Sequence, residues 1–300
     1  MEKVGQTLSH SGHLRQAETD ALMQEILADS EIAEFIANHH LTSEQIKRSL
    51  PKFNQYRNER AKFQSGDTSY IAKGYQPVIF MNEGYADVSY RETAELKVAQ
   101  RQRAIEERIH LVSLPKTYKK ITFQDVTLDD VKRVEVFQDL VNFVADYPQN
   151  GQKGLYLYGD MGVGKSFILA AMARELAENK GVSTTFLHFP SFAIDVKNAI
   201  NTGTVKEEID AVKKAELLIL DDIGAEQSTS WIRDEVLQVI LQYRMLEELP
   251  TFFTSNYSFA DLERKLGSVK GSDESWQAKR VMERIRFLAK EVHLQGENRR

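Results

Sequence analysis

Apolar and polar residues follow two distinct patterns in the second half of the chain. Short, mainly apolar runs lie at 154–158, 184–189, 217–222 and 251–256. Between them, apolar residues recur every three or four positions, which is the spacing of one face of a helix. Runs that are apolar on both faces of a strand belong to parallel sheets covered by helices. The pattern therefore predicts a doubly wound α/β domain with a parallel sheet.

The same spacing indicates where the helices of this domain lie. One helix precedes the first strand, and others separate the strands. The predicted helices lie at about 128–147, 167–180, 191–201, 204–215, 229–247 and 258–266, and a further helix and a terminal strand follow.

The first hundred residues have a different pattern. Residues 1–50 carry helical apolar stripes, and residues 66–90 contain short β-rich runs separated by glycine and proline. Acidic and basic side chains alternate over 91–110, which favours a solvated linking helix over a nucleic-acid-binding arm. We predict a smaller, mainly helical domain with a small β element over 1–100, a linker over 101–114 and the α/β domain over 115–300.

Composition limits the class of protein and its compartment. The chain has 300 residues, 42% of them hydrophobic, a formal charge of −5 and no cysteine. No apolar run approaches the ~20 residues that cross a bilayer, and the start lacks the apolar core of a signal peptide, so we expect a cytoplasmic protein without membrane contact. Without cysteine, neither a disulfide nor a thiolate zinc site is expected. The negative charge restricts any DNA contact to a local basic surface.

One motif lies between the first apolar run and the helix after it. Residues 159–166 read G-D-M-G-V-G-K-S and match the spacing G-x-x-x-x-G-K-[ST]. Such glycines let successive N–H groups point at an anion, the lysine reaches the β- and γ-phosphates, and the serine hydroxyl can hold Mg²⁺. The alternative is a glycine-rich turn with a surface lysine, but the flanking strand and helix favour a phosphate site. The predicted nucleotide-binding residues are Gly159, Gly162, Val163, Gly164, Lys165, Ser166 and Phe167.

Acidic and amide side chains follow two other predicted strands. Asp221 and Asp222 end the third apolar run, and Asn256 ends the fourth. Ligands of parallel α/β sheets bind beyond the carboxyl ends of the strands. We therefore expect Asp221 to hold Mg²⁺ together with Ser166, and Asp222 and Asn256 to act on the water that attacks the γ-phosphate. The alternative is that the two aspartates only cap a helix.

The motifs extend over the segments 154–166, 217–226, 231–235, 252–256 and 281–286. Together these segments resemble the AAA+ ATPases of the DnaC/DnaI clade of helicase loaders. The resemblance covers about 115–300. In the first hundred residues, K-G-Y-Q-P at 73–77 with Gly84 and Tyr85 resembles the DnaI-type loaders of Gram-positive bacteria.

The resemblance implies a P-loop AAA+ fold and the activity of a helicase loader. In such a loader the N-terminal domain grips the replicative DNA helicase hexamer, and the ATPase domain binds ATP and single-stranded DNA while the helicase is placed on a strand. The resemblance also implies a primosome component of replication initiation and restart. Other primosome or initiator proteins are expected partners, as is self-assembly through the ATPase domain.

The catalytic motifs of the clade map onto this sequence residue by residue. Walker A falls on 159–166, Walker B on Asp221 and Asp222, and sensor 1 on Asn256. Many AAA+ relatives carry glutamate where Asp222 stands. The resemblance therefore implies an Mg²⁺-dependent ATPase with slow, switch-like turnover.

The arginine finger of the family falls on Arg284, with Arg280 and Arg286 as neighbouring alternatives. Such an arginine would stabilise the transition state on ATP bound by an adjacent subunit. The alternative is an arginine on the surface of a helix.

Two features depart from the family pattern. Only 44 residues follow Asn256, so we expect neither a C-terminal lid nor a sensor 2 arginine. The cysteine-rich zinc site of bacillar relatives falls on 63–70, which has no such ligand, so no zinc is expected.

The clade inserts an extra helix after its second strand, and that region is the candidate DNA contact. Its lysines could bind phosphates and its phenylalanine could stack on a base, although lysines on such a helix are commonly just solvated. The candidate DNA-binding residues are Phe192, Lys197, Lys206, Lys213 and Lys214.

Three other functions fit part of the sequence. An IstB-like transposition helper ATPase shares the ATPase motifs but not the segment at 73–77. A small-molecule P-loop kinase would need a substrate pocket and a lid, and a non-hydrolysing adaptor would keep its nucleotide as a structural element.

Overall fold

The computed structural model describes residues 20–149, 151–227, 229–268 and 274–299. The chain divides into two compact units, with the boundary between Arg101 and Gln102. This boundary lies inside helix α4 (Ala94–Glu107). Each unit has its own hydrophobic core.

The first unit consists of short helices and a hairpin. Asp29 caps its second helix by accepting the N–H groups of Glu31 and Ile32. Thr42 and Gln45 form a reciprocal capping box at the start of the longest helix, which ends at Gly66 in the left-handed conformation. The elements are a helical segment over 20–27, α2 (Ser30–Asn38), α3 (Ser43–Ser65), β1 (Tyr75–Asn82) and β2 (Tyr85–Glu92).

The hairpin expected between 66 and 90 is present, and it packs on α3. β1 and β2 pair antiparallel, and both turn residues, Glu83 and Gly84, have positive φ, as a type I′ hairpin turn requires. Phe53 of α3 is fully buried in a core that Ala86 of the hairpin also enters. The apolar stripe predicted from residue 14 lies partly within 1–19, outside the described residues.

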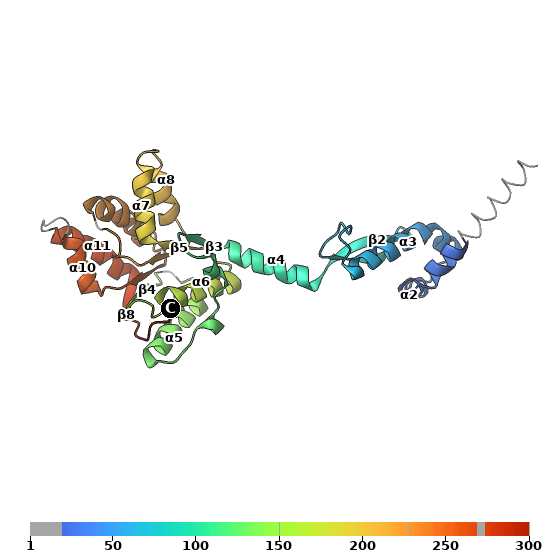
Figure 1. Cartoon of the computed structure of the whole chain (residues 1–300), viewed down its shortest axis with the longest axis horizontal. Helices are drawn as coiled ribbons and strands as arrows, with labels where there is room; N and C mark the ends of the chain where they lie inside the picture. The colour runs from blue at the N-terminus through green and yellow to red at the C-terminus, as the bar shows by residue number, and fades with distance from the viewer. Residues whose placement is uncertain (1–19, 150, 228, 269–273, 300) are drawn as a thin grey trace, which may run out of the picture. The chain divides into compact units, whose positions relative to one another are not determined.

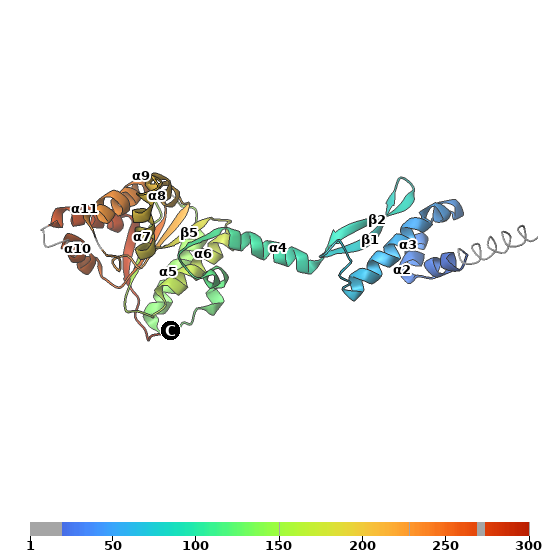
Figure 2. The same ribbon diagram turned by 45° about the horizontal axis from the view of Figure 1, so that its top comes forward.

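The second unit is built on a six-stranded parallel sheet with the order β3-β5-β6-β7-β4-β8. The prediction of a doubly wound α/β domain is confirmed, and Figures 1 and 2 show helices on both faces of the sheet. The strands are β3 (Ile109–Val112), β4 (Gly154–Tyr158), β5 (Thr184–His188), β6 (Leu217–Asp221), β7 (Thr251–Ser255) and β8 (Ala289–His293).

Residues 101–114, which the sequence predicts to be a linker, instead form mainly regular secondary structure. They include the end of α4 and the edge strand β3, which pairs with β5. Ile109 at the start of β3 is 1% exposed, so burial and strand pairing hold this segment in the sheet. Four residues are too few for a periodic pattern to distinguish an edge strand from a connection.

The helices of the second unit fall close to the predicted positions. The predicted helix over 229–247 is a π-helical turn, η3, that continues into α9. The elements are η1 (Lys116–Lys120), η2 (Phe123–Asp125), α5 (Val131–Asp146), α6 (Lys165–Asn179), α7 (Phe189–Ala199), α8 (Val205–Lys213), η3 (Ile232–Leu237), α9 (Gln238–Leu246), α10 (Phe259–Gly267) and α11 (Ser275–Leu288).

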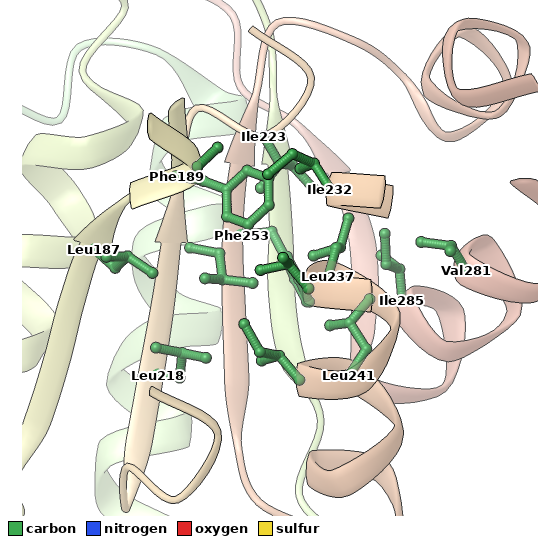
Figure 3. Close-up of a cluster of buried hydrophobic side chains, with 14 of the residues drawn as sticks. Leu187, Phe189, Leu218, Ile223, Ile232, Leu237, Leu241, Phe253, Val281 and Ile285 are labelled. Atoms are coloured by element: carbon green, nitrogen blue, oxygen red, sulfur yellow. The ribbon is translucent and has the colours of Figure 1, made fainter. Parts of the chain in front are cut away.

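Alternate residues of each strand enter two different cores. Leu155 and Leu157 of β4 pack with α5 and α6, whereas Tyr156 between them packs on the opposite face. The core on that opposite face, drawn in Figure 3, includes Ile285 of α11, and α10 also contributes to it. In the part of the chain that the structure describes, the residues after Asn256 thus belong to the sheet domain, with no separate lid bundle.

A buried arginine lies at the amino-terminal ends of the central strands. Arg244 of α9 is fully buried, and its Nε donates to the Thr251 hydroxyl at 2.7 Å. Its other nitrogens donate to the carbonyls of Lys213, Ala215 and Pro250. Burial lowers the pKa of Arg244 to about 9.

No described helix combines the length and the apolar character needed to cross a bilayer.

Phe53→Ala should destabilise the first unit and leave the second unchanged. Truncating a fully buried phenylalanine costs about 3–5 kcal/mol of unfolding free energy. Both tryptophans, Trp231 and Trp276, lie in the second unit, so their fluorescence reports only that unit. In urea, circular dichroism should show an earlier transition while the fluorescence transition stays in place.

Val98→Ala is the matched control, because Val98 is 61% exposed and its truncation removes little buried surface. An equal shift of the fluorescence transition in Phe53→Ala would show that the two units unfold together and would contradict separate cores.

Candidate functional site

The loop between β4 and α6 has the backbone of an anion cradle. Gly162 and Gly164 have φ values of 83° and 92°, in the left-handed region that side chains disfavour. Gly164 precedes the first turn of α6, and no side chain caps that turn. The N–H groups and the helix dipole at this end therefore favour an anionic ligand.

Lys165 extends back into this loop. The side chain is largely buried, at 8% exposure. Its ammonium donates to the carbonyls of Gly159 at 2.8 Å and Asp160 at 2.9 Å, and to the side-chain oxygen of Asn256 at 2.9 Å. The phosphate loop and the end of β7 are thus joined through one cation.

Asp221 lies at the end of β6 and accepts two hydroxyl hydrogen bonds. Ser166 Oγ donates to its Oδ1 at 2.6 Å and Thr254 Oγ1 donates to the same atom at 2.7 Å. Burial raises the pKa of Asp221, and the two hydroxyls partly oppose that rise. The carboxylate is therefore costly to keep charged without a cation nearby.

Asp222 is held in an uncommon backbone conformation. Its φ is 58°, and its N–H donates to Thr254 Oγ1 at 2.8 Å. Asn256 Nδ2 donates to Asp222 Oδ1 at 3.1 Å. Asn256 therefore bridges the Lys165 ammonium and the Asp222 carboxylate.

These side chains surround one cavity of about 780 Å³, a size that suits a small-molecule ligand. Most of the residues predicted for the site line it. Of the predicted nucleotide-binding residues, two do not: Gly159 contributes its carbonyl to Lys165, and Val163 is buried in the core beneath the loop. The predicted residues on the cavity wall are Gly162, Gly164, Lys165, Ser166, Phe167, Asp221, Asp222 and Asn256.

The sequence predictions missed several side chains on the cavity wall, among them Thr254, His188, Arg133 and Arg299. Thr254 could have been found, because it is polar and lies near the end of an apolar strand, like Asn256. His188 ends β5 and bonds to Ser191, while Arg133 of α5 and Arg299 after β8 come from segments without a motif. No pattern in the sequence signals these last two.

The predicted arginine finger lies away from the cavity of its own chain. Arg284 of α11 is half-buried, and its Nε donates to Gln242 at 2.8 Å. Arg286 pairs with Glu263 at 2.7 Å, and Arg280 is exposed. None of these three arginines is among the residues that line the cavity.

The structure corrects one of the predicted DNA contacts. Phe192 is 2% exposed and packs in the core against Phe189, so its ring cannot stack on a base. Lys213 pairs with Asp210 and lies over the ring of Tyr243. The remaining candidates differ in exposure: Lys206 and Lys214 are exposed, and Lys197 is half-buried.

The oxygen donors at the site suit a magnesium ion. Mg²⁺ prefers carboxylate and hydroxyl oxygens together with phosphate oxygens of a bound substrate. Ser166 Oγ and the Asp221 carboxylate already lie within hydrogen-bond distance of each other. The described residues contain no group of three or more His, Cys, Asp or Glu side chains arranged for a metal ion.

Two family models match the chain. The model described as "Primosomal protein DnaI N-terminus" matches residues 1–90. The model described as "IstB-like ATP binding protein" matches residues 83–300. Together they account for both units.

Curated and solved relatives agree with these models. The chain is 36% identical to the replicative helicase loader DnaI of Bacillus subtilis over 293 residues, which cover 95% of this chain and 94% of that protein. A crystal structure of DnaI matches 63% of this chain and 98% of its own, with 40% identity and a TM-score of 0.58. A crystal structure of the DnaC helicase loader matches 60% and 100%, with 25% identity and a TM-score of 0.51.

Asp221→Asn should stabilise the protein near pH 7 when no nucleotide or metal is present. The native state binds the Asp221 proton more tightly than the unfolded state, so the carboxyl group lowers stability as pH rises through its raised pKa. Asparagine keeps an acceptor for Ser166 and Thr254. Thermal melting should show a gain of a few degrees that shrinks as the pH is lowered toward about 4.

Asp195→Asn, at an exposed position on α7, should melt like the wild type throughout. A lower melting temperature for Asp221→Asn near pH 7 would contradict a destabilising buried charge at Asp221.

Proposed function

Because the chain belongs to the DnaI family of replicative helicase loaders, with an IstB-like ATP-binding domain, we propose that it loads the replicative DNA helicase onto single-stranded DNA, using ATP, during replication initiation and restart. One observation supports the ATP-dependent part above all others. Lys165, Ser166, Asp221, Asp222 and Asn256, which come from three neighbouring strand ends, line one cavity.

ATP binds with its phosphates in the loop over 159–166. The N–H groups of the loop and the first turn of α6 offer donors, and the Lys165 ammonium supplies a charge that reaches the β- and γ-phosphates. Lys165 is already held inward by its three oxygen acceptors, so little side-chain entropy is lost when the nucleotide arrives.

Ser166 and Asp221 hold the magnesium ion that accompanies ATP. Bound there, Mg²⁺ would neutralise charge on the β- and γ-phosphates. A cation would also relieve the cost of the buried Asp221 carboxylate, whose pKa burial raises. Thr254 holds the carboxylate in place through its hydroxyl.

Asp222 and Asn256 orient the attacking water. Asp222 accepts from Asn256, and Asn256 in turn accepts from Lys165, so the three side chains form one chain of hydrogen bonds. An aspartate reaches less far than the glutamate of many relatives, which supports slow, switch-like hydrolysis.

Arg284 acts as the arginine finger for a neighbouring subunit, which requires self-assembly through the ATPase domain. Two features support this choice: Arg284 is outside the cavity of its own chain, and it is held by Gln242 rather than by a carboxylate. Arg286 is a weaker candidate because Glu263 already pairs with it.

The first unit binds the replicative helicase hexamer, and other primosome or initiator proteins are further partners. The match of residues 1–90 to the DnaI N-terminus supports this assignment. The same match disfavours an IstB-like transposition helper, since the IstB-like model covers only residues 83–300.

Single-stranded DNA contacts the region of α7 and α8 through phosphate-binding lysines. Lys206 and Lys214 are the better candidates because both side chains are exposed. With Phe192 buried, base stacking by that residue is not part of the proposal.

Single substitutions should separate ATP binding from hydrolysis. Lys165→Ala should abolish ATP binding, while Asp222→Asn and Arg284→Ala should bind ATP normally and hydrolyse it at least about tenfold more slowly. ATP binding and ATPase rate should be measured with and without single-stranded DNA and Mg²⁺.

Arg286→Ala is the matched control on the same helix and should hydrolyse ATP at the wild-type rate. Equal, low rates in the wild type and every variant would favour a non-hydrolysing adaptor. Loss of ATP affinity in Arg284→Ala would mean that this arginine serves its own subunit.

Helicase binding should reside in the first unit. Residues 1–101, immobilised, should retain the replicative helicase of the same organism, and residues 102–300 should not. The same fragment with Phe53→Ala is the control, because loss of its core should abolish retention. Retention by residues 102–300 alone would contradict this assignment.

A further inference from the structure

Arg133 lies directly behind the phosphate loop. It belongs to α5, is 2% exposed, and its Nη1 donates to the Val163 carbonyl at 2.7 Å. Its Nη2 is 2.9 Å from the position that a Cβ on Gly164 would take, so the guanidinium fills the space left by that glycine. Arg133 also lines the nucleotide cavity.

In the part of the chain that the structure describes, no salt bridge pairs the positive charge of Arg133. Among the described residues, its Nε has no hydrogen-bond partner and no carboxylate lies within ion-pair distance. The two nearby acids are engaged elsewhere: Asp129 pairs with Arg299, and Asp130 caps α5 through the N–H groups of Lys132 and Arg133. Burial lowers the pKa of Arg133, and repulsion from Arg299 adds to that effect.

The segment after β8 contacts the same loop. Leu294 N–H donates to the Tyr158 carbonyl at 2.8 Å, and Arg299 N–H donates to the Gly162 carbonyl at 3.0 Å. The Asn298 side-chain oxygen is 2.2 Å from the position of a Cβ on Gly162. Residues 298–299 therefore lie against the loop where a larger residue at 162 would push them away.

Two successive carbonyls of the phosphate loop are thus bonded, Gly162 to Arg299 and Val163 to Arg133. In a trans peptide unit the C=O and the following N–H point in opposite directions. Because both carbonyls accept hydrogen bonds from outside the loop, the N–H groups of Val163 and Gly164 point toward the opposite side of the loop. Those N–H groups are then oriented before any anion binds.

We propose that Arg133 and residues 298–299 form an outer brace of the phosphate loop, which presets its N–H groups and places the Arg133 charge for the triphosphate. This inference rests on the proposed binding of ATP at the loop. It assigns Arg133 as a positioning residue outside the motif, and it assigns a nucleotide-site role to the segment after β8. The bound phosphates would supply the counter-charge that Arg133 lacks.

A purely structural role for Arg133 predicts a different result. A structural arginine contributes to stability with or without nucleotide, and its loss lowers the melting temperature. A buried cation without a paired anion costs free energy in the empty protein, so its neutralisation leaves the empty protein no less stable. Under our proposal, neutralising Arg133 lowers the affinity for ATP but does not lower the stability of the nucleotide-free protein.

The test uses the full chain with Arg133→Gln, Arg133→Lys and a variant that ends at Gln295. ATP affinity is measured by equilibrium binding in Mg²⁺, and thermal melting is measured without nucleotide. Arg133→Gln should weaken ATP binding about 10- to 100-fold without lowering the melting temperature, as expected for a charge-assisted interaction. Arg133→Lys should retain more affinity than Arg133→Gln. The shortened chain should bind ATP about 3- to 10-fold more weakly, as expected for a lost neutral hydrogen bond.

Arg244→Gln is the matched control, because Arg244 is also buried but lies at the opposite edge of the sheet. Unlike Arg133, Arg244 donates to the Thr251 hydroxyl and to three backbone carbonyls, which glutamine cannot all satisfy. Arg244→Gln should therefore lower the melting temperature and leave the ATP affinity of the folded protein unchanged. Wild-type affinity in Arg133→Gln would overturn the role of Arg133, as would a fall in melting temperature with no advantage for lysine.

Wild-type affinity in the chain ending at Gln295 would remove residues 298–299 from the brace. Failure of the wild type itself to bind ATP would instead refute the proposed function, and the inference with it.

Discussion

The site depends on the pairing of three neighbouring strands. β6, β7 and β4 lie side by side in parallel, so their carboxyl ends meet at one edge of the sheet. Asp221 and Asp222, Asn256, and the phosphate loop follow those three ends. These strands are buried on both faces, and packing against α6 on one face and α9 on the other fixes their register. The polar side chains at the strand ends therefore come together directly, without long loops.

At this edge, opposite charges are separated by neutral groups. The amide of Asn256 lies between the Lys165 ammonium and the Asp222 carboxylate, and two hydroxyls surround the Asp221 oxygen. A preorganised polar site of this kind keeps its charges available for the ligand.

The fold was predictable from the sequence where the pattern was long. The buried strands β4, β6 and β7 and the phosphate loop gave clear signals, because double-faced burial and glycine spacing are visible in the residues themselves. The strand β3 was missed because four residues form no period. Arg133 and Arg299 were missed because their role arises from tertiary contacts between segments far apart in the chain. Phe192 was misassigned since helical spacing shows which side chains share a face but not whether that face is covered.

The left-handed backbone of Asp222 has a consequence for which acid can occupy this position. At φ 58°, aspartate and asparagine are tolerated more readily than longer side chains, since their short polar groups bond locally. The N–H of Asp222 is fixed to Thr254, so the backbone cannot relax toward a helical angle without losing that bond. Glutamate would be strained here. The local conformation therefore favours the shorter acid at this position. Replacing Asp222 by glutamate would lengthen the side chain and strain the backbone at the same time.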